Sequence, residues 1–227
     1  MANNHNISSE WINFKKNFKK KWHFNQLKKT SDLRVIGNLK TDFSQILKKI
    51  KTSKNNKNKN YFVSNRKSKD KAFIKRNNDL IKIGYKKNTN EFFQIFSYQY
   101  QELFQKFIDV TGLEDGVSSI ILQPPGNVLG WHQDAYVQFR KKHPQKSKNN
   151  RVVRYMILME DWDWGHSFTA GNSTITQWKQ GDIVYWEPYM FHCGANAGML
   201  DKITLNITGF ETHKSLHLNK TKKIIKI

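Results

Sequence analysis

The second half of the chain alternates between polar and apolar residues, which is the pattern of half-buried β-strands. In residues 202–208 every even position is polar and every odd position is apolar. Further short strands, each bounded by turn signals, are predicted at residues 117–123, 129–137, 151–160, 164–169, 173–178 and 183–187, and around position 192. About eight short strands at close spacing predict a sandwich or barrel.

The first half of the chain shows apolar residues at helical spacing instead. Residues 11–22 and 39–50 have this pattern, and residues 91–113 show it most strongly, with Gly112 near the end. Residues 51–60 are a Lys/Asn low-complexity stretch, which predicts a surface loop. We therefore expect one compact domain with three parts: a helical, Lys/Asn-rich part packed on a barrel (1–116), a β core (117–210) and a basic C-terminal tail (211–227).

Two histidines and one aspartate in the predicted β part have the order of a metal site. If residues 129–137 are extended, His132 and Asp134 point to the same face, because side chains two apart in a strand share a face. His192, much later in the chain, could supply a third ligand. Two imidazoles and one carboxylate are the ligand set of non-haem Fe(II) oxygenases, and they leave other coordination positions open.

A basic residue and a hydroxyl residue stand side by side on the polar face of residues 202–208. They are Lys202 and Thr204, and a dicarboxylate that chelates iron at one end needs such a pair for its far carboxylate. With these residues the chain resembles the 2-oxoglutarate/Fe(II)-dependent dioxygenase superfamily. That family has His-x-Asp, a distal His, a basic residue about ten positions later and a hydroxyl residue two further on. Lys202 stands where many members of the family have Arg, but Lys is known at this position in the prolyl-hydroxylase branch. A Lys ammonium is a point charge, whereas an Arg guanidinium can bind both carboxylate oxygens.

The resemblance covers roughly residues 117–210 and implies both a fold and an activity. The fold is mainly β with N-terminal helices: a double-stranded β-helix, the cupin-like jelly roll. The implied protein is an enzyme that uses Fe(II), 2-oxoglutarate and O2 to hydroxylate a C–H bond. His132, Asp134 and His192 would be its catalytic metal ligands, and Lys202 and Thr204 would bind the co-substrate.

The resemblance leaves the substrate open between a protein side chain, a nucleobase and a small molecule. Related halogenases bind halide where this chain has the Asp134 carboxylate, which favours hydroxylation. The segment WKQGDIVYW at residues 178–186 is similar to phage and marine-bacterial members of the family, but it names no substrate.

Arg154 is a further candidate for binding 2-oxoglutarate. It shares a face of the predicted strand 151–160 with Met156 and Leu158. If it points inward, it is a buried cation that needs a partner such as a co-substrate or substrate carboxylate. If it points outward, it is an ordinary surface residue at the start of a strand. The sequence leaves both alternatives open.

The net charge of +21 suggests a second class of function, a non-catalytic basic nucleic-acid-binding protein on a jelly-roll scaffold. Only six of the 39 cationic residues are Arg, however, and an excess of Lys, Asn and Ile is typical of an AT-rich genome, such as that of a phage or a marine bacterium. No apolar run has the length of a membrane span, and no signal peptide is visible, so no membrane partner is expected. A single Cys provides no disulfide framework, which favours an intracellular, cytoplasmic setting.

Overall fold

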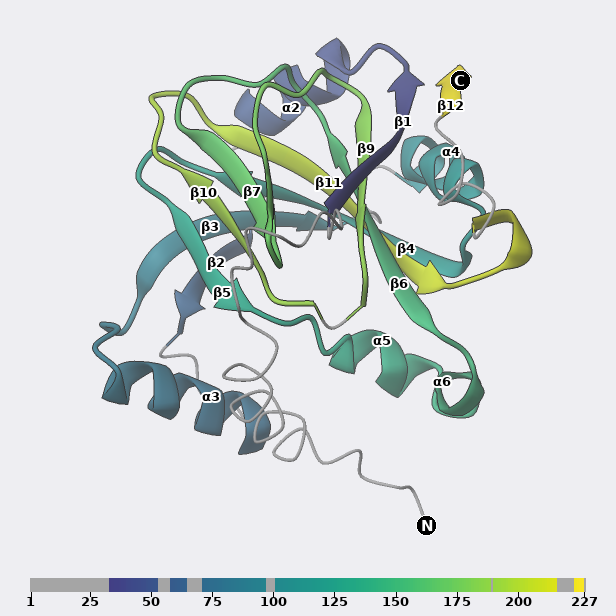
Figure 1. The fold of residues 1–227 in the computed structure, drawn as a ribbon. Coiled ribbons are helices and arrows are strands. Elements are labelled where there is room, and N and C mark those ends of the chain that lie inside the picture. The colour runs from purple at the N-terminus through teal and green to yellow at the C-terminus, as the bar shows by residue number, and fades with distance from the viewer. Residues whose placement is uncertain are drawn as a thin grey trace.

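The described part of the protein contains two β-sheets that face each other (Figure 1). The computed structural model describes residues 33–52, 58–64, 71–96, 101–188, 190–215 and 223–226. The larger sheet has the strand order β12-β1-β9-β6-β11-β4-β3-β2. Its strands are β1 (Leu33–Lys40), β2 (Asn58–Val63), β3 (Thr89–Phe96), β4 (Glu114–Gln123), β6 (Val152–Leu158), β9 (Asp182–Trp186), β11 (Lys202–Phe210) and β12 (Lys223–Lys226). The smaller sheet has the order β5-β10-β7-β8, with β5 (Val128–His132), β7 (His166–Ala170), β8 (Ser173–Ile175) and β10 (His192–Asn196).

The strands from β4 to β11 pass back and forth between the two sheets. Strands β4, β6, β9 and β11 belong to the larger sheet, and β5, β7, β8 and β10 lie between them in sequence but belong to the smaller one. All pairings among these eight strands are antiparallel. This interleaving is the double-stranded β-helix that the sequence predicted, and the prediction is confirmed.

The larger sheet separates two buried regions of different character. Ile203, Leu205 and Ile207 on β11 join the main apolar core, together with residues of α2 (Ser44–Thr52) and α4 (Gln101–Thr111). The opposite face of β11, with Lys202 and Thr204, borders a cavity between the sheets. The alternation seen in the sequence therefore sorts the strand into an apolar side against helices and a polar side against the cavity.

The remaining helices are α3 (Lys71–Lys82), α5 (Val137–Lys142) and α6 (Lys146–Asn149). Helix α3 packs against β2 through a small apolar cluster that contains Phe62, Val63 and Leu80. Figure 1 shows α3 on the opposite side of the molecule from α2. Within the described ranges, no helix has both the length and the apolar character that a membrane crossing requires.

The prediction of one helix over residues 91–113 is wrong for its first part. Residues 91–96 belong to β3, which pairs with β2 on one side and with β4 on the other, and the helix α4 begins only at Gln101. Phe92 and Gln94 face the cavity, whereas Phe93 and Ile95 pack on the apolar core. Pairing with two neighbouring strands thus outweighed the helical spacing of the aromatic residues, because local propensity is a weak preference.

Residues 1–116 are also less helical than the sequence suggested. Their described ranges contain α2, α3 and α4, but β1, β2 and β3 extend the larger sheet of the core. Part of the expected loop at 51–60 is the start of β2, while the apolar pattern at 11–22 lies outside the described residues. In the basic tail, β12 pairs in parallel with β1.

Candidate metal centre

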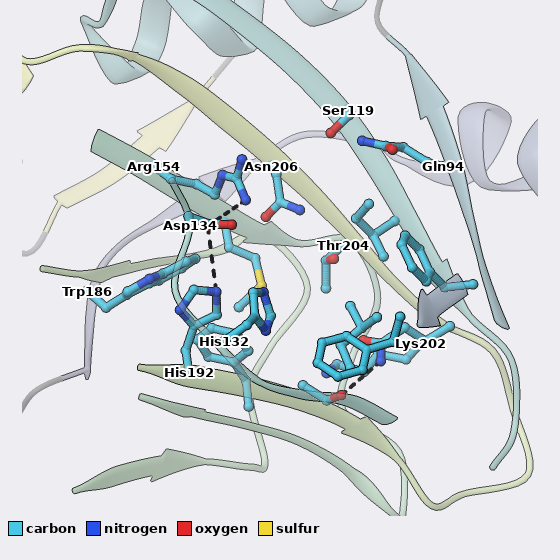
Figure 2. A pocket seen from close by; sticks show the side chains of 18 of the residues that line it. Gln94, Ser119, His132, Asp134, Arg154, Trp186, His192, Lys202, Thr204 and Asn206 are labelled. Atoms are coloured by element: carbon cyan, nitrogen blue, oxygen red, sulfur yellow. Dashed lines mark hydrogen bonds and ion pairs between the residues drawn. The ribbon is translucent and has the colours of Figure 1, made fainter. Parts of the chain in front are cut away.

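His132, Asp134 and His192 come together into one cluster that could hold a metal ion. One donor atom from each residue lies within 4.8 Å of the others. Strands β5 and β10 pair in antiparallel register with His132 directly opposite His192, and their ring centroids are 4.3 Å apart. The Asp134 Oδ2 atom lies 3.6 Å from His192 Nε2 (Figure 2). The three residues singled out in the sequence are therefore neighbours in the fold.

The strand that carries His132 is shorter than predicted. Strand β5 ends at His132, and the residues from 133 to 136 are irregular before α5 begins at Val137. Tyr136 has a positive φ of 51°, which turns the chain at this point. Asp134 lies just beyond the end of β5 and still reaches the cluster, so the expected proximity of His132 and Asp134 holds, while the predicted extended segment 129–137 is too long.

Both imidazoles are held in the tautomer that leaves Nε2 free. His132 Nδ1 lies 2.7 Å from the carbonyl oxygen of Gly130, and His192 Nδ1 lies 2.9 Å from that of Met190. A carbonyl oxygen only accepts hydrogen bonds, so Nδ1 carries the proton in each ring. The Nε2 lone pairs are then available to a metal, and the Nδ1 bonds fix the ring orientations.

The surroundings also keep both rings neutral. Burial lowers the pKa of His132 to about 3, and the neighbouring His192 adds to this effect against the opposing attraction of Asp134. Burial likewise lowers the pKa of His192. Metals bind the neutral imidazole, so neither ligand has to lose a proton at neutral pH.

Arg154 points inward and pairs with the carboxylate of the cluster. Its Nη1 donates to Asp134 Oδ2 at 2.6 Å, and its Nε donates to Thr208 Oγ1 at 2.9 Å. The guanidinium also lies over the Tyr136 ring, 5.2 Å from the centroid. Burial alone would raise the pKa of Asp134, but the charge of Arg154, and then the two histidines, lower the pKa overall. The carboxylate is therefore ionised and oriented, as a metal ligand must be.

A cavity of about 350 Å³ opens beside the cluster and includes all three of its residues. The inward face of β11 supplies a polar wall of Lys202, Thr204 and Asn206 (Figure 2). Lys202 is only 2% exposed, and its Nζ donates to the carbonyl oxygen of Ser167 at 2.6 Å. Burial lowers the pKa of Lys202 to about 7, against a small opposing effect of Cys193.

Gly194 keeps open the space around Lys202. A Cβ atom at this position would lie 3.3 Å from Lys202 Nζ and 3.3 Å from the Gln123 Oε1 atom. Strand β10 thus places His192 in the cluster. Two residues later it has Gly194, which has no side chain, beside the buried ammonium of Lys202. All residues proposed from the sequence for the site, including Lys202, Thr204 and Arg154, line this one cavity.

The sequence did not single out several other residues that line the cavity. These are chiefly Arg76 on α3, Phe62 on β2, Gln94 on β3, and Ser119 on β4. Most of them lie on elements that the sequence placed outside the β core. The one available signal was that Arg76 is one of only six arginines in a chain whose cations are mostly Lys.

No protein-family model and no curated protein matches this chain. Solved structures that resemble it include three bacterial proteins. A predicted oxalate decarboxylase from Thermotoga maritima is 13% identical, with a TM-score of 0.34 over 53% of this chain and 82% of that one. A cupin-like protein from the same organism is 14% identical, with a TM-score of 0.34 over 57% and 73%. A double-stranded β-helix protein from Klebsiella pneumoniae is 18% identical, with a TM-score of 0.29 over 42% and 67%. Likenesses this distant say nothing about activity, and the strand order itself defines the fold.

Proposed function

We propose that this protein is an Fe(II)- and 2-oxoglutarate-dependent oxygenase that hydroxylates a C–H bond. The observation that supports this most is the convergence of His132, Asp134 and His192 with free Nε2 atoms and an ionised carboxylate. Two imidazoles and one carboxylate fit Fe(II) and leave coordination positions for other ligands. When bound, Fe(II) with 2-oxoglutarate and O2 would supply the oxidising chemistry, which no protein side chain provides.

Lys202 and Thr204 are the residues that we propose bind the far carboxylate of 2-oxoglutarate. Both are nearly buried, at 2% and 4% exposed, and both line the cavity of the metal cluster. No carboxylate among the described residues lies within ion-pairing distance of Lys202. A buried ammonium without a counter-charge is unfavourable, so an entering dicarboxylate would supply a missing partner.

Arg154 has a different role in this proposal from Lys202. Its guanidinium already donates hydrogen bonds to Asp134 and Thr208. We therefore propose that Arg154 orients the metal ligand Asp134 and does not bind the co-substrate. Trp186 lies beside His192, with ring centroids 5.1 Å apart, and helps to exclude water from that side. The alternative of a non-catalytic nucleic-acid-binding protein gives no function to this buried set of ligands.

An anaerobic titration with Fe(II) and 2-oxoglutarate tests the metal centre. The wild-type protein should develop the weak visible charge-transfer absorption of a chelated 2-oxo acid. His192→Ala should abolish it by removing a ligand, while His213→Ala, which changes an exposed histidine, should leave it unchanged. Equal absorption in all three proteins would refute the ligand assignment.

Replacing Lys202 tests the co-substrate site separately from the metal. Lys202→Ala should weaken 2-oxoglutarate binding by roughly one to two decades, because a charge-assisted contact is worth about 1.5–3 kcal/mol. Fe(II) binding should change far less, since Lys202 does not contact the ligands. An unchanged 2-oxoglutarate affinity in this variant would show that the far carboxylate of 2-oxoglutarate binds to other residues. No Fe(II)-dependent consumption of 2-oxoglutarate with any substrate class would instead favour the non-catalytic alternative.

A further inference from the structure

A third cation, Arg76, lines the same cavity as Lys202 and Arg154. It belongs to α3, and its guanidinium lies over the Phe62 ring at 4.6 Å from the centroid. The Phe62 ring in turn meets His132 edge-on, with centroids 5.9 Å apart. The distance from the Arg76 guanidinium carbon to the centroid of the His132 ring is therefore at most the sum of these two distances. A small molecule can span that separation.

The guanidinium of Arg76 is charged, and only one of its nitrogen atoms donates hydrogen bonds to described residues. Its Nη1 donates to the carbonyl oxygen of Phe62 at 3.0 Å and lies 3.5 Å from Asn77 Oδ1. Within the described ranges, Nε and Nη2 donate to no acceptor, and no carboxylate lies within ion-pairing distance. Burial lowers the pKa of Arg76 to about 10, so the side chain remains protonated at neutral pH. A charge withdrawn from water in this way favours an incoming anion.

Arg76 is separate from the proposed co-substrate site. Lys202 is on β11, whereas Arg76 is on α3, which packs against β2. Strands β4 and β3 lie between β11 and β2, so the backbones of β11 and β2 are three interstrand steps, or roughly 14 Å, apart. The two cations therefore enter the cavity from different elements.

The wall of the cavity that β3, β4 and β11 form carries neutral polar groups. Gln94, Ser119 and Asn206 come from β3, β4 and β11, and Figure 2 shows Gln94 and Ser119 at the end of the pocket away from Lys202. Their amides and hydroxyl can donate and accept hydrogen bonds but cannot neutralise a charge. Arg154 is already paired with Asp134. Among the described cations that line the cavity, Arg76 is therefore the one that neither pairs with a carboxylate nor belongs to the proposed co-substrate site.

We propose that Arg76 binds a carboxylate or phosphate group of the substrate, so that the substrate is an anionic molecule held with its reacting carbon at the metal. This inference rests on the proposed function of the metal cluster. A carboxylate and a phosphate each offer two oxygen atoms that can accept hydrogen bonds from the N–H groups of one guanidinium.

The test uses the full-length protein loaded with Mn(II) and 2-oxoglutarate, with inorganic phosphate and propionate as probes. Mn(II) broadens the magnetic resonance signals of nuclei near it, so ³¹P and ¹³C line widths report anion binding close to the cluster. Wild-type protein should broaden at least one probe in a saturable way. Arg76→Gln should weaken that binding about tenfold or more. Lys75→Gln, which removes an exposed charge from the same helix, should not. Stronger binding of phosphate would indicate a phosphorylated substrate, and stronger binding of propionate a carboxylic acid.

Arg76→Lys keeps the charge, so it distinguishes the loss of an anion-binding charge from a folding defect in the glutamine variant. It should retain part of the anion binding, and its thermal unfolding should match the wild type. Equal broadening in wild type and Arg76→Gln would overturn the inference, as would an Arg76→Gln variant that instead loses 2-oxoglutarate affinity. Failure of the wild type to bind Mn(II) would refute the proposed function itself. Intact Mn(II) binding with Arg76-independent anion binding would refute only this inference.

Discussion

At the scale of single residues, the ion pair of Arg154 and Asp134 connects the strand β6 to the metal cluster. The 2.6 Å contact keeps the carboxylate ionised and fixes its orientation. The exposed fractions of the two side chains are 26% and 15%, so water competes only partly for this contact. Partners of this kind support a metal ligand without touching the metal.

Replacing Arg154 by Met should therefore weaken metal binding by about tenfold to a hundredfold, which is the usual effect of losing such a partner. Without the guanidinium, the buried Asp134 retains a proton more readily, and an incoming metal has to displace it. Arg151→Met is the matched control, because Arg151 is on the same chain segment but pairs with Glu187 and Glu211 instead. Calorimetric titration with Mn(II) measures both variants. An Arg154→Met variant that binds Mn(II) like the control would contradict this role.

Lys202 should make the free energy of unfolding depend on pH. Burial lowers its pKa in the folded protein to about 7 from the ordinary value of 10.5. Between these values the unfolded chain binds more protons than the folded protein, so this residue makes the free energy of unfolding rise with pH. The rise begins near pH 7, where the folded-state amine starts to lose its proton.

Comparison of wild type with Lys202→Met isolates this contribution. The wild-type free energy of unfolding should increase relative to that of the variant by up to about 1.4 kcal/mol per pH unit between pH 7 and 9. Urea denaturation of the metal-free proteins at several pH values measures the difference. A constant difference over this range would show that Lys202 keeps an ordinary pKa in the fold.

At the scale of elements, the turns hold the strands of the double-stranded β-helix in place. Gly181, before β9, has a φ of +85°, and its carbonyl oxygen accepts a hydrogen bond from Leu39 at 2.8 Å. A Cβ atom here would lie 2.2 Å from the Leu39 carbonyl oxygen. The turn and the end of β1 therefore require glycine both for its backbone conformation and for its missing side chain.

Gly181→Ala should accordingly destabilise the protein more than Gly126→Ala. Gly126 also has a positive φ, of +77°, but a Cβ atom there would meet nothing within 4 Å. Both variants carry the cost of the left-handed conformation, and only Gly181→Ala also has to break the contact with β1. We expect an additional loss of at least about 1 kcal/mol, comparable to one hydrogen bond, in the free energy of unfolding. Equal losses would show that the turn can move away from β1 freely.

At the scale of the whole molecule, the net charge of +21 is the dominant electrostatic feature. The described lysines of α2, such as Lys48 and Lys49, are exposed, and they lie on the side of the larger sheet opposite the metal cavity. Such a charge attracts nucleic acids through counterion release, whatever the sequence of the nucleic acid. We expect this attraction to be unrelated to the chemistry of the cavity.

Binding to duplex DNA should therefore be weak, independent of base sequence and steeply reduced by salt. Neutralising Lys19, Lys20 and Lys21, which lie outside the described residues, should flatten the salt dependence. A control with Lys40, Lys48 and Lys49 neutralised should have a similar effect, because both variants lose three charges. Neither should change 2-oxoglutarate turnover. Loss of both binding and turnover in the first variant alone would instead indicate a nucleic-acid substrate.

Much of the fold and the cluster of ligands could be predicted from the sequence by itself. Side chains alternate along a strand with a period of two, so the polar and apolar faces of β11 are a local property of residues 202–208. The ligand types of His132, Asp134 and His192, and the face shared by Lys202 and Thr204, follow from residue identity and spacing. For the same reason Arg154 could be placed on the face of Met156, which also borders the cavity.

Only the tertiary structure decided the features that depend on partners far away in sequence. Residues 91–96 form a strand because β2 and β4 flank them, although their own aromatic spacing fits a helix. His192 meets His132 because β10 pairs with β5, and Arg154 on β6 meets the Asp134 carboxylate from the other sheet. Arg76 enters the cavity because α3 packs on a strand added to the edge of the core. No local pattern contains such information, since these contacts form between segments that meet only when the chain folds.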